Sequence, residues 1–147
     1  NLTAPPPNLI VVPRLPAKNL QGIDSSQAMV FFYNPRKEKD LVVFVDARNE
    51  QLYQEGHIPG AYQFDPYRPE KYLAVVIPVC QAAEQVVVYC TGSDCEDSEL
   101  AAILLRDTSI ANQKLFVYVG GFTEWAAGNL PVEIGERKSG RLQNFGK

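Results

Sequence analysis

The chain has 147 residues, of which 46% are hydrophobic, and its formal net charge is −3 at pH 7. This length suits one domain, and the absence of any grouping of Lys and Arg argues against nucleic acid or an anionic membrane surface as the main partner. The longest apolar stretch, residues 72–83, is too short to span a bilayer, and three cysteines do not suffice for a disulfide scaffold.

The predicted elements divide the chain into three parts. Residues 1–17 contain five prolines and are expected to form an extended lead-in. Residues 18–135 are expected to form the domain, and residues 136–147 a polar C-terminal tail. The chain begins with Asn1 rather than Met, which leaves room for a leader, a membrane anchor or a further domain upstream.

Within the domain, apolar β-branched runs alternate with helical patterns. The continuous runs at residues 41–45, 86–89 and 115–119 predict strands that are buried on both faces. Helices are predicted at Ser25–Tyr33, Asn49–Glu55, Pro69–Ala83, Glu96–Arg106 and Phe122–Ala127. Ser25 and Asn49 are suitable N-caps, and Pro69 suits a first helical turn. The alternation predicts an α/β fold with a mainly parallel central sheet and helices on both faces.

The ends of the three strands indicate where function should lie, because ligands of open α/β sheets bind beyond the carboxyl ends of the strands. These ends are Asp46-Ala47-Arg48, Cys90-Thr91-Gly92 and Gly120-Gly121. One of them carries a nucleophile, and Cys90 is therefore the candidate catalytic residue.

The segment that follows Cys90 leads from a strand into a helix. Ser93 with Glu96 is suited to a capping box, and Asp94 is an alternative cap. Gly92 allows the loop to curl, so that its amide groups and the helix N-terminus would stabilise a thiolate or a persulfide anion at Cys90. An inert cysteine buried at a strand end explains the local sequence equally well.

Two further motifs, one on each side of Cys90, resemble the signatures of the rhodanese family. Asp46-Ala47-Arg48 and the following residues 55–61, Glu-Gly-His-Ile-Pro-Gly-Ala, are similar to its front signature. Residues 117–125 with Gly128 and residues 130–132 resemble its closing signature.

The resemblance extends over residues 25–133 and places Cys90 where the family has its catalytic cysteine. It implies a parallel sheet covered on both faces and sulfur transfer through a persulfide on Cys90. It also implies an active-site loop made of Thr91, Gly92, Ser93, Asp94, Cys95 and Glu96. Ser98 takes the place of the family's small hydroxyl residue, somewhat later along the loop.

The loop departs from the family pattern in its charge. Many rhodaneses have arginines where this chain has Thr91 and Cys95, and their absence disfavours a phosphatase. Asp94, Glu96 and Asp97 make the loop acidic, and such carboxylates oppose thiolate formation and repel an anionic donor such as thiosulfate.

Cys95 offers a second chemistry. A curled loop can bring Cys90 and Cys95 within disulfide distance, and Cys95 would then resolve a persulfide or sulfenic acid on Cys90. Packing of Cys95 on the first helical turn is the alternative. Two cysteines and one distant histidine fall short of a zinc site.

Several other residues are expected to support the site. His57, the only histidine, is expected to hold the turn that follows it by hydrogen bonding rather than to act as a general base. Asp46 and Arg48 are expected to form a structural ion pair or loop clamp, with Glu55 as a candidate third member.

The remaining candidates concern packing. Gly120 and Gly121 should let the backbone pass close to the active loop, Trp125 should close the core, and Cys80 should be buried and inert. For three aromatic residues, Tyr62, Phe64 and Tyr67, the sequence does not decide between a place at the rim of the pocket and packing within their loop.

The sequence as a whole predicts a sulfurtransferase that passes sulfane sulfur from Cys90 to a thiol or other nucleophilic acceptor. Its partners would be a small sulfur-containing substrate and a thiol or protein acceptor, with no cofactor and no metal. A thiol–disulfide redox module using Cys90 and Cys95, and a non-catalytic rhodanese-fold binding domain, are the alternatives. We expect a monomer, because no apolar helix face is left over.

Overall fold

The computed structural model describes residues 19–143, so the expected lead-in at residues 1–17 lies outside the described residues. Its centre is a five-stranded sheet with the strand order β1-β5-β4-β2-β3. The strands are β1 (Gln21–Ile23), β2 (Val42–Asp46), β3 (Tyr62–Gln63), β4 (Gln85–Tyr89) and β5 (Leu115–Tyr118). Every pairing in this sheet is parallel.

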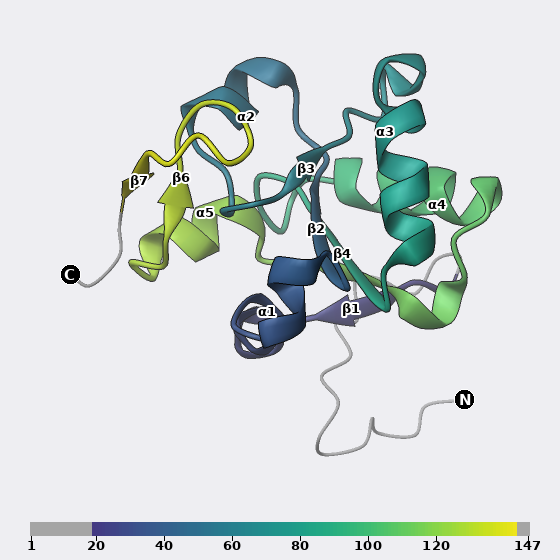
Figure 1. The fold of residues 1–147 in the computed structure, drawn as a ribbon, viewed down its shortest axis with the longest axis horizontal. Helices are drawn as coiled ribbons and strands as arrows, with labels where there is room; N and C mark the ends of the chain where they lie inside the picture. The colour runs from purple at the N-terminus through teal and green to yellow at the C-terminus, as the bar shows by residue number, and fades with distance from the viewer. Residues whose placement is uncertain (1–18, 144–147) are drawn as a thin grey trace.

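Helices connect the strands and cover both faces of the sheet. They are α1 (Ser25–Phe32), α2 (Glu50–Glu55), α3 (Pro69–Ala82), α4 (Asp97–Thr108) and α5 (Gly121–Ala127), with short 3-10 turns η2 (Pro35–Lys39) and η3 (Asn112–Lys114). α1 and α5 lie on one side of β2 and β4, and α3 and α4 lie on the other (Figure 1). The predicted α/β fold is confirmed.

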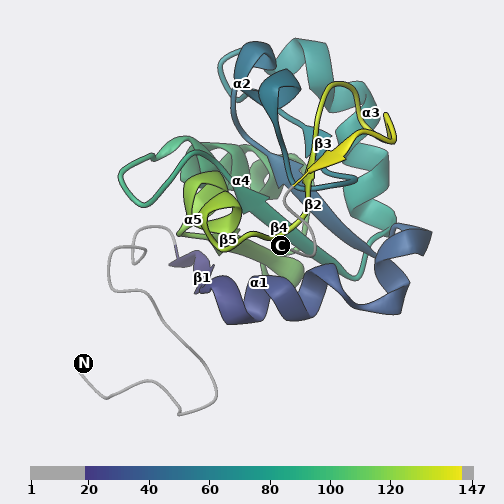
Figure 2. The same cartoon turned by 90° about the vertical axis from the view of Figure 1, so that its left-hand side faces the viewer.

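The two faces of the sheet build two cores, because successive side chains of a strand point to opposite sides. In β2, Val43 and Val45 belong to the core under α3 and α4, whereas Val42 and Phe44 belong to the core under α1 and α5. Figure 2 shows this layering from the side of α5. The burial of both faces explains why the central strands are continuous apolar runs.

The short edge strands β1 and β3 are absent from the prediction. They have three and two residues, too few for a periodic pattern to be visible. Tertiary pairing defines them, since β1 adds to β5 and β3 adds to β2.

The structure corrects two helix caps. Asp24, not Ser25, is the N-cap of α1, and it forms a capping box with Gln27. The N-cap position of α4 is Glu96, with no side-chain cap bond, so the predicted caps at Ser93 and Asp94 are wrong. Those two residues lie instead in the turn that precedes the helix. The predicted cap at Asn49 and the place of Pro69 in a first helical turn are confirmed.

The C-terminal part of the described chain folds back onto the domain. β6 (Val132–Glu133) pairs with β7 (Leu142–Gln143) in an antiparallel ribbon. Between them, Arg137 donates a hydrogen bond to the carbonyl of Gly60 at 2.9 Å and stacks 3.7 Å from the ring centre of Tyr62. Part of the segment that we expected to be a polar tail is therefore attached to the domain.

The described residues contain no helix with the length and apolarity needed to cross a membrane. Residues 19–143 also contain no group of three or more His, Cys, Asp or Glu side chains that could hold a metal ion.

Candidate functional site

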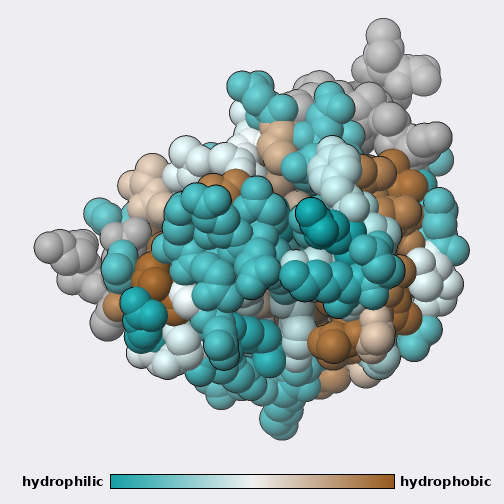
Figure 3. Space-filling view, turned by 90° about the horizontal axis from the view of Figure 1, so that it is seen from above, coloured by the Kyte–Doolittle hydropathy of each residue, from teal (hydrophilic) through white to brown (hydrophobic). Residues whose placement is uncertain are grey.

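The carboxyl ends of β2 and β4 meet at one edge of the sheet. The amide of Ala47 donates to the carbonyl of Tyr89 at 2.8 Å, which holds the two strand ends side by side. Figure 3 looks down onto this edge, and hydrophilic residues cover most of the visible surface. Cys90 is the first residue after β4 and so lies at this edge.

The backbone around Cys90 is fixed by the start of α5. The amide of Phe122 donates to the carbonyl of Cys90 at 2.8 Å, and that of Thr123 to the carbonyl of Thr91 at 2.9 Å. Gly121 has φ +67°, and a Cβ there would lie 2.6 Å from the carbonyl oxygen of Cys90. The expectation that a glycine lets the backbone pass close to the loop is confirmed at Gly121; Gly120 is the N-cap residue of α5.

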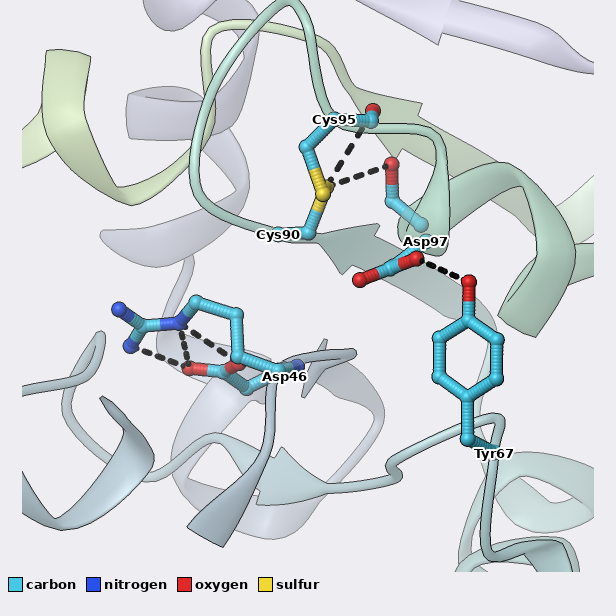
Figure 4. Close-up of a disulfide and its surroundings, with 7 residues drawn as sticks. Asp46, Tyr67, Cys90, Cys95 and Asp97 are labelled. Atoms are coloured by element: carbon cyan, nitrogen blue, oxygen red, sulfur yellow. Dashed lines mark hydrogen bonds and ion pairs between the residues drawn. A yellow bond between two sulfur atoms is a disulfide. The ribbon is translucent and has the colours of Figure 1, made fainter. Parts of the chain in front are cut away.

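Cys90 and Cys95 form a disulfide whose Cα atoms are 6.4 Å apart (Figure 4). This separation lies within the range of protein disulfides. Cys90 is only 1% exposed, whereas Cys95 is half-buried. A surface hollow of about 450 Å³ lies over the loop, and its lining consists of Thr91, Gly92, Ser93, Asp94, Cys95 and Thr123.

The sulfur of Cys90 lies at the N-terminal end of α4. Its Sγ is 3.5 Å from the hydroxyl oxygen of the buried Ser98 and 3.4 Å from the carbonyl oxygen of Cys95. Among the described residues, the polar atoms that contact this sulfur are thus a hydroxyl oxygen and a carbonyl oxygen. The sequence instead predicts that the amide groups of the loop surround it. A helix N-terminus and a hydroxyl that turns its proton toward the sulfur favour a sulfur anion at this position, whereas the carbonyl oxygen opposes it.

Acidic side chains surround the exposed part of the loop. Asp94 and Glu96 are exposed, and Asp97 accepts a 2.8 Å hydrogen bond from the hydroxyl of Tyr67. This hydrogen bond to a carboxylate raises the pKa of Tyr67 and keeps the phenol a donor. Figure 4 shows this hydrogen bond at the start of α4, and neither Tyr67 nor Asp97 is among the residues that line the hollow.

Phe64 and Tyr62, the other two aromatic residues whose position the sequence left open, pack elsewhere in the domain. Phe64 is fully buried in the core under α3 and α4. Tyr62 donates to Asp40 at 2.7 Å and packs under Arg137.

Asp46 and Arg48 form a buried ion pair at 2.8 Å, set apart from the disulfide in Figure 4. Burial opposes the charge of Arg48, but the hydrogen bond and attraction from Asp46 outweigh it, so the pKa of Arg48 is raised. Arg48 also donates to the carbonyl of Gly56 and thereby clamps the segment after α2. The expected ion pair is present, but Glu55 is not a member, because it is exposed and bonded to Gln51.

His57 is fully buried and connects two segments that are distant in the sequence. Its Nδ1 lies 2.8 Å from the carbonyl oxygen of Tyr53, and its Nε2 lies 2.9 Å from Oε1 of Glu133. The same Oε1 accepts a 2.9 Å hydrogen bond from the amide of Gly60. His57 therefore holds the following turn through Glu133.

Residues 32–128 match the family model of the rhodanese-like domain, which is more than half of the chain. The chain belongs to the rhodanese-like domain family.

Among curated proteins, this rhodanese-like domain is 33% identical over 100 residues to an HTH-type transcriptional regulator of Mycobacterium tuberculosis. The match covers 68% of the chain but only 41% of the length of that regulator. Among solved structures, the chain resembles a thiosulfate sulfurtransferase from Pseudomonas aeruginosa, with a TM-score of 0.60 at 19% identity over 80% of this chain and 21% of the other. It also resembles a rhodanese-like domain from an Anabaena protein, with a TM-score of 0.56 at 22% identity over 80% and 81% of the two chains. The two structural likenesses show the shared fold.

Three residues of this rhodanese-like domain were missed or left undecided by the sequence. Glu133 directly follows the closing signature, and its adjacency to that motif is the only signal that pointed to it. Thr123 lines the hollow although it comes from α5. Tyr67 reaches Asp97 from the loop after β3, and nothing local in the sequence indicates this hydrogen bond.

Proposed function

We propose that this rhodanese-like domain is a sulfurtransferase that carries sulfane sulfur as a persulfide on Cys90. The position of Cys90 supports this function most directly. It lies between the carboxyl end of β4 and the N-terminus of α4, its backbone is fixed by α5, and the hydroxyl oxygen of Ser98 lies 3.5 Å from its sulfur. Such surroundings favour the anionic sulfur that this chemistry needs.

The transfer has two steps. The Cys90 thiolate attacks the outer sulfur of a persulfide donor, a new S–S bond forms, and the donor leaves as its thiolate. An acceptor thiolate then attacks that outer sulfur and takes it away, which restores the Cys90 thiolate. Asp94 and Glu96 repel the thiosulfate dianion, so uncharged or cationic persulfides are the better donors.

The pairing of Cys90 with Cys95 favours thiol–disulfide chemistry as a second candidate function. In this reaction the Cys95 thiolate attacks Sγ of a Cys90 persulfide. The bond between Sγ and the outer sulfur breaks, hydrosulfide leaves, and the Cys90–Cys95 disulfide forms. A thiol must then reduce that disulfide before the next cycle.

Intact-mass measurements on single-cysteine variants distinguish these functions. Reduced Cys95→Ser protein should gain one sulfur atom on Cys90 from an alkyl persulfide and lose it to an added thiol, with less uptake from thiosulfate. Reduced wild-type protein should pass from the persulfide to the disulfide and release hydrosulfide if the second function holds.

The Cys90→Ser variant is the control and should gain no transferable sulfur. Sulfur uptake at Cys80 or Cys95 alone would contradict the role of Cys90. Absence of uptake from every donor would contradict both functions and favour a binding domain, for instance within a longer protein such as the regulator that the chain resembles in part.

A further inference from the structure

The two cysteines of the disulfide differ in their access to solvent. Cys90 is 1% exposed and lies beneath the loop, next to the buried Ser98. Cys95 is half-buried and forms part of the lining of the surface hollow, whereas Cys90 does not line it. A molecule that arrives from solvent therefore meets Cys95 first.

We propose that thiols enter the oxidised site at Cys95, and that Cys90 is the leaving group. This inference rests on the second function proposed above, in which the Cys90–Cys95 disulfide is part of the cycle. The incoming thiolate attacks Sγ of Cys95 and forms a mixed disulfide there. The bond between the two cysteines breaks, and Cys90 leaves with the electron pair as a thiolate.

The surroundings of Cys90 suit a leaving group. A thiol leaves more readily when its anion is stabilised, and Sγ of Cys90 lies within 3.5 Å of the Ser98 hydroxyl at the N-terminus of α4. A second thiolate then attacks the sulfur of the first thiol in the mixed disulfide and releases Cys95 as a thiolate, so that both cysteines are reduced. The thiol is the reductant, and it leaves as its own disulfide.

The charge around the entry point selects among thiols. Asp94 lines the hollow, Glu96 is exposed beside it, and the chain has no Lys or Arg between Lys71 and Arg106. Asp94 and Glu96 are the two neighbours of Cys95 in the chain, and their carboxylates attract a cationic thiol and repel an anionic one. A cationic thiol should therefore react several-fold faster than an anionic one at low salt, and the difference should shrink as salt screens the charges.

Trapping the mixed disulfide tests the point of entry. Oxidised wild-type protein is mixed with cysteamine, quenched at short times with excess N-ethylmaleimide, and mapped by peptide mass spectrometry. Cysteamine on Cys95 together with maleimide on Cys90 is the expected result. Cysteamine on Cys90, or an equal distribution between the two cysteines, would overturn the proposal.

The charge selectivity is measured with thiols of different charge and a matched variant. Rate constants per thiolate are compared for cysteamine, mercaptoethanol and 3-mercaptopropionate. Asp94→Asn/Glu96→Gln should reduce the ratio of the cysteamine to the mercaptopropionate rate constant toward one, with Asp97 retained. Glu38→Gln/Asp107→Asn removes the same types of charge from exposed positions away from the loop and should leave the ratio unchanged. Equal ratios in the two double variants would overturn the selectivity.

The failure of this inference can be told apart from the failure of sulfur transfer. If oxidation of the wild-type protein gives no Cys90–Cys95 disulfide, entry through Cys95 is overturned. Sulfur uptake by the Cys95→Ser variant still decides the sulfurtransferase function independently, because that variant has no disulfide to open.

Discussion

At the scale of single residues, Glu133 connects the two signatures that flank the active-site loop. Burial raises the free energy of its charge, but hydrogen bonds from the amides of Gly60 and Lys138 and from His57 outweigh this cost, so the pKa of Glu133 is lowered. A carboxyl whose pKa is lower in the folded than in the unfolded chain stabilises the fold above its ordinary pKa. That stability is lost as the pH falls through the folded pKa.

Glu133→Gln should therefore lower the free energy of unfolding at pH 7 by about 1–3 kcal/mol, since a charged acceptor of several hydrogen bonds is replaced by a neutral one. The difference between variant and wild type should shrink as the pH falls below the ordinary carboxyl pKa of 4.5 and disappear only below the lower pKa that Glu133 has in the folded protein. Urea unfolding at pH 7 and in acid measures both. Glu136→Gln, at an exposed position, is the control and should change stability by less than about 0.5 kcal/mol. A Glu133→Gln effect that is the same at both pH values would contradict the ionic role.

At the scale of elements, the loop after β4 is shaped by α5 rather than by its own sequence. The first residues of α5 donate two hydrogen bonds to the backbone of Cys90 and Thr91, and Gly121 permits that approach. This explains why caps predicted from Ser93 and Asp94 are wrong: the chain is held by contacts across the site before α4 begins. The apolar runs of β2, β4 and β5 are predictable because burial on both faces leaves a local pattern, whereas the pairing of β1 and β3 leaves none.

Gly121→Ala should be more destabilising than Gly140→Ala, although both glycines have positive φ, +67° and +84°. Both substitutions place an alanine in the left-handed region at a cost of about 1 kcal/mol. At Gly121 the new Cβ also meets the backbone of Cys90, whereas at Gly140 nothing lies within 4 Å. We expect an additional cost of about 1–3 kcal/mol for Gly121→Ala, together with slower alkylation or sulfur loading of Cys90. Equal losses in the two variants by chemical denaturation would contradict the close approach.

At the scale of the whole molecule, two cores on either side of one sheet make the fold cooperative. Trp125 is fully buried on one side, where it contacts the rings of Phe32, Phe44 and Tyr118. Cys80 is fully buried on the other side, and burial raises the pKa of its thiol to about 12. Solvent reaches Cys80 only when α3 separates from the sheet, which opens one of the two cores.

Reduced native protein should therefore react with iodoacetamide at the half-buried Cys95 long before it reacts at Cys80. At pH 8 a thiol with a pKa of about 12 is almost entirely protonated, and labelling of Cys80 should follow global opening. Peptide mass spectrometry over time measures the order, and unfolding in urea should make all three cysteines react at similar rates. Labelling of Cys80 as fast as Cys95 in the native state would contradict its burial in a cooperative core.

The sequence by itself determined the α/β class, the helices and central strands, the family and the position of Cys90 at the carboxyl edge of the sheet. These features depend on local apolar patterns and on motifs that are contiguous in the chain. Only the tertiary structure decided that Cys95 is the more exposed partner of a disulfide with Cys90, that Tyr67 reaches Asp97, and that Glu133 binds His57 and Gly60. Each of these contacts joins side chains whose relative position is set by packing of the whole domain, and such positions have no signature in the order of neighbouring residues.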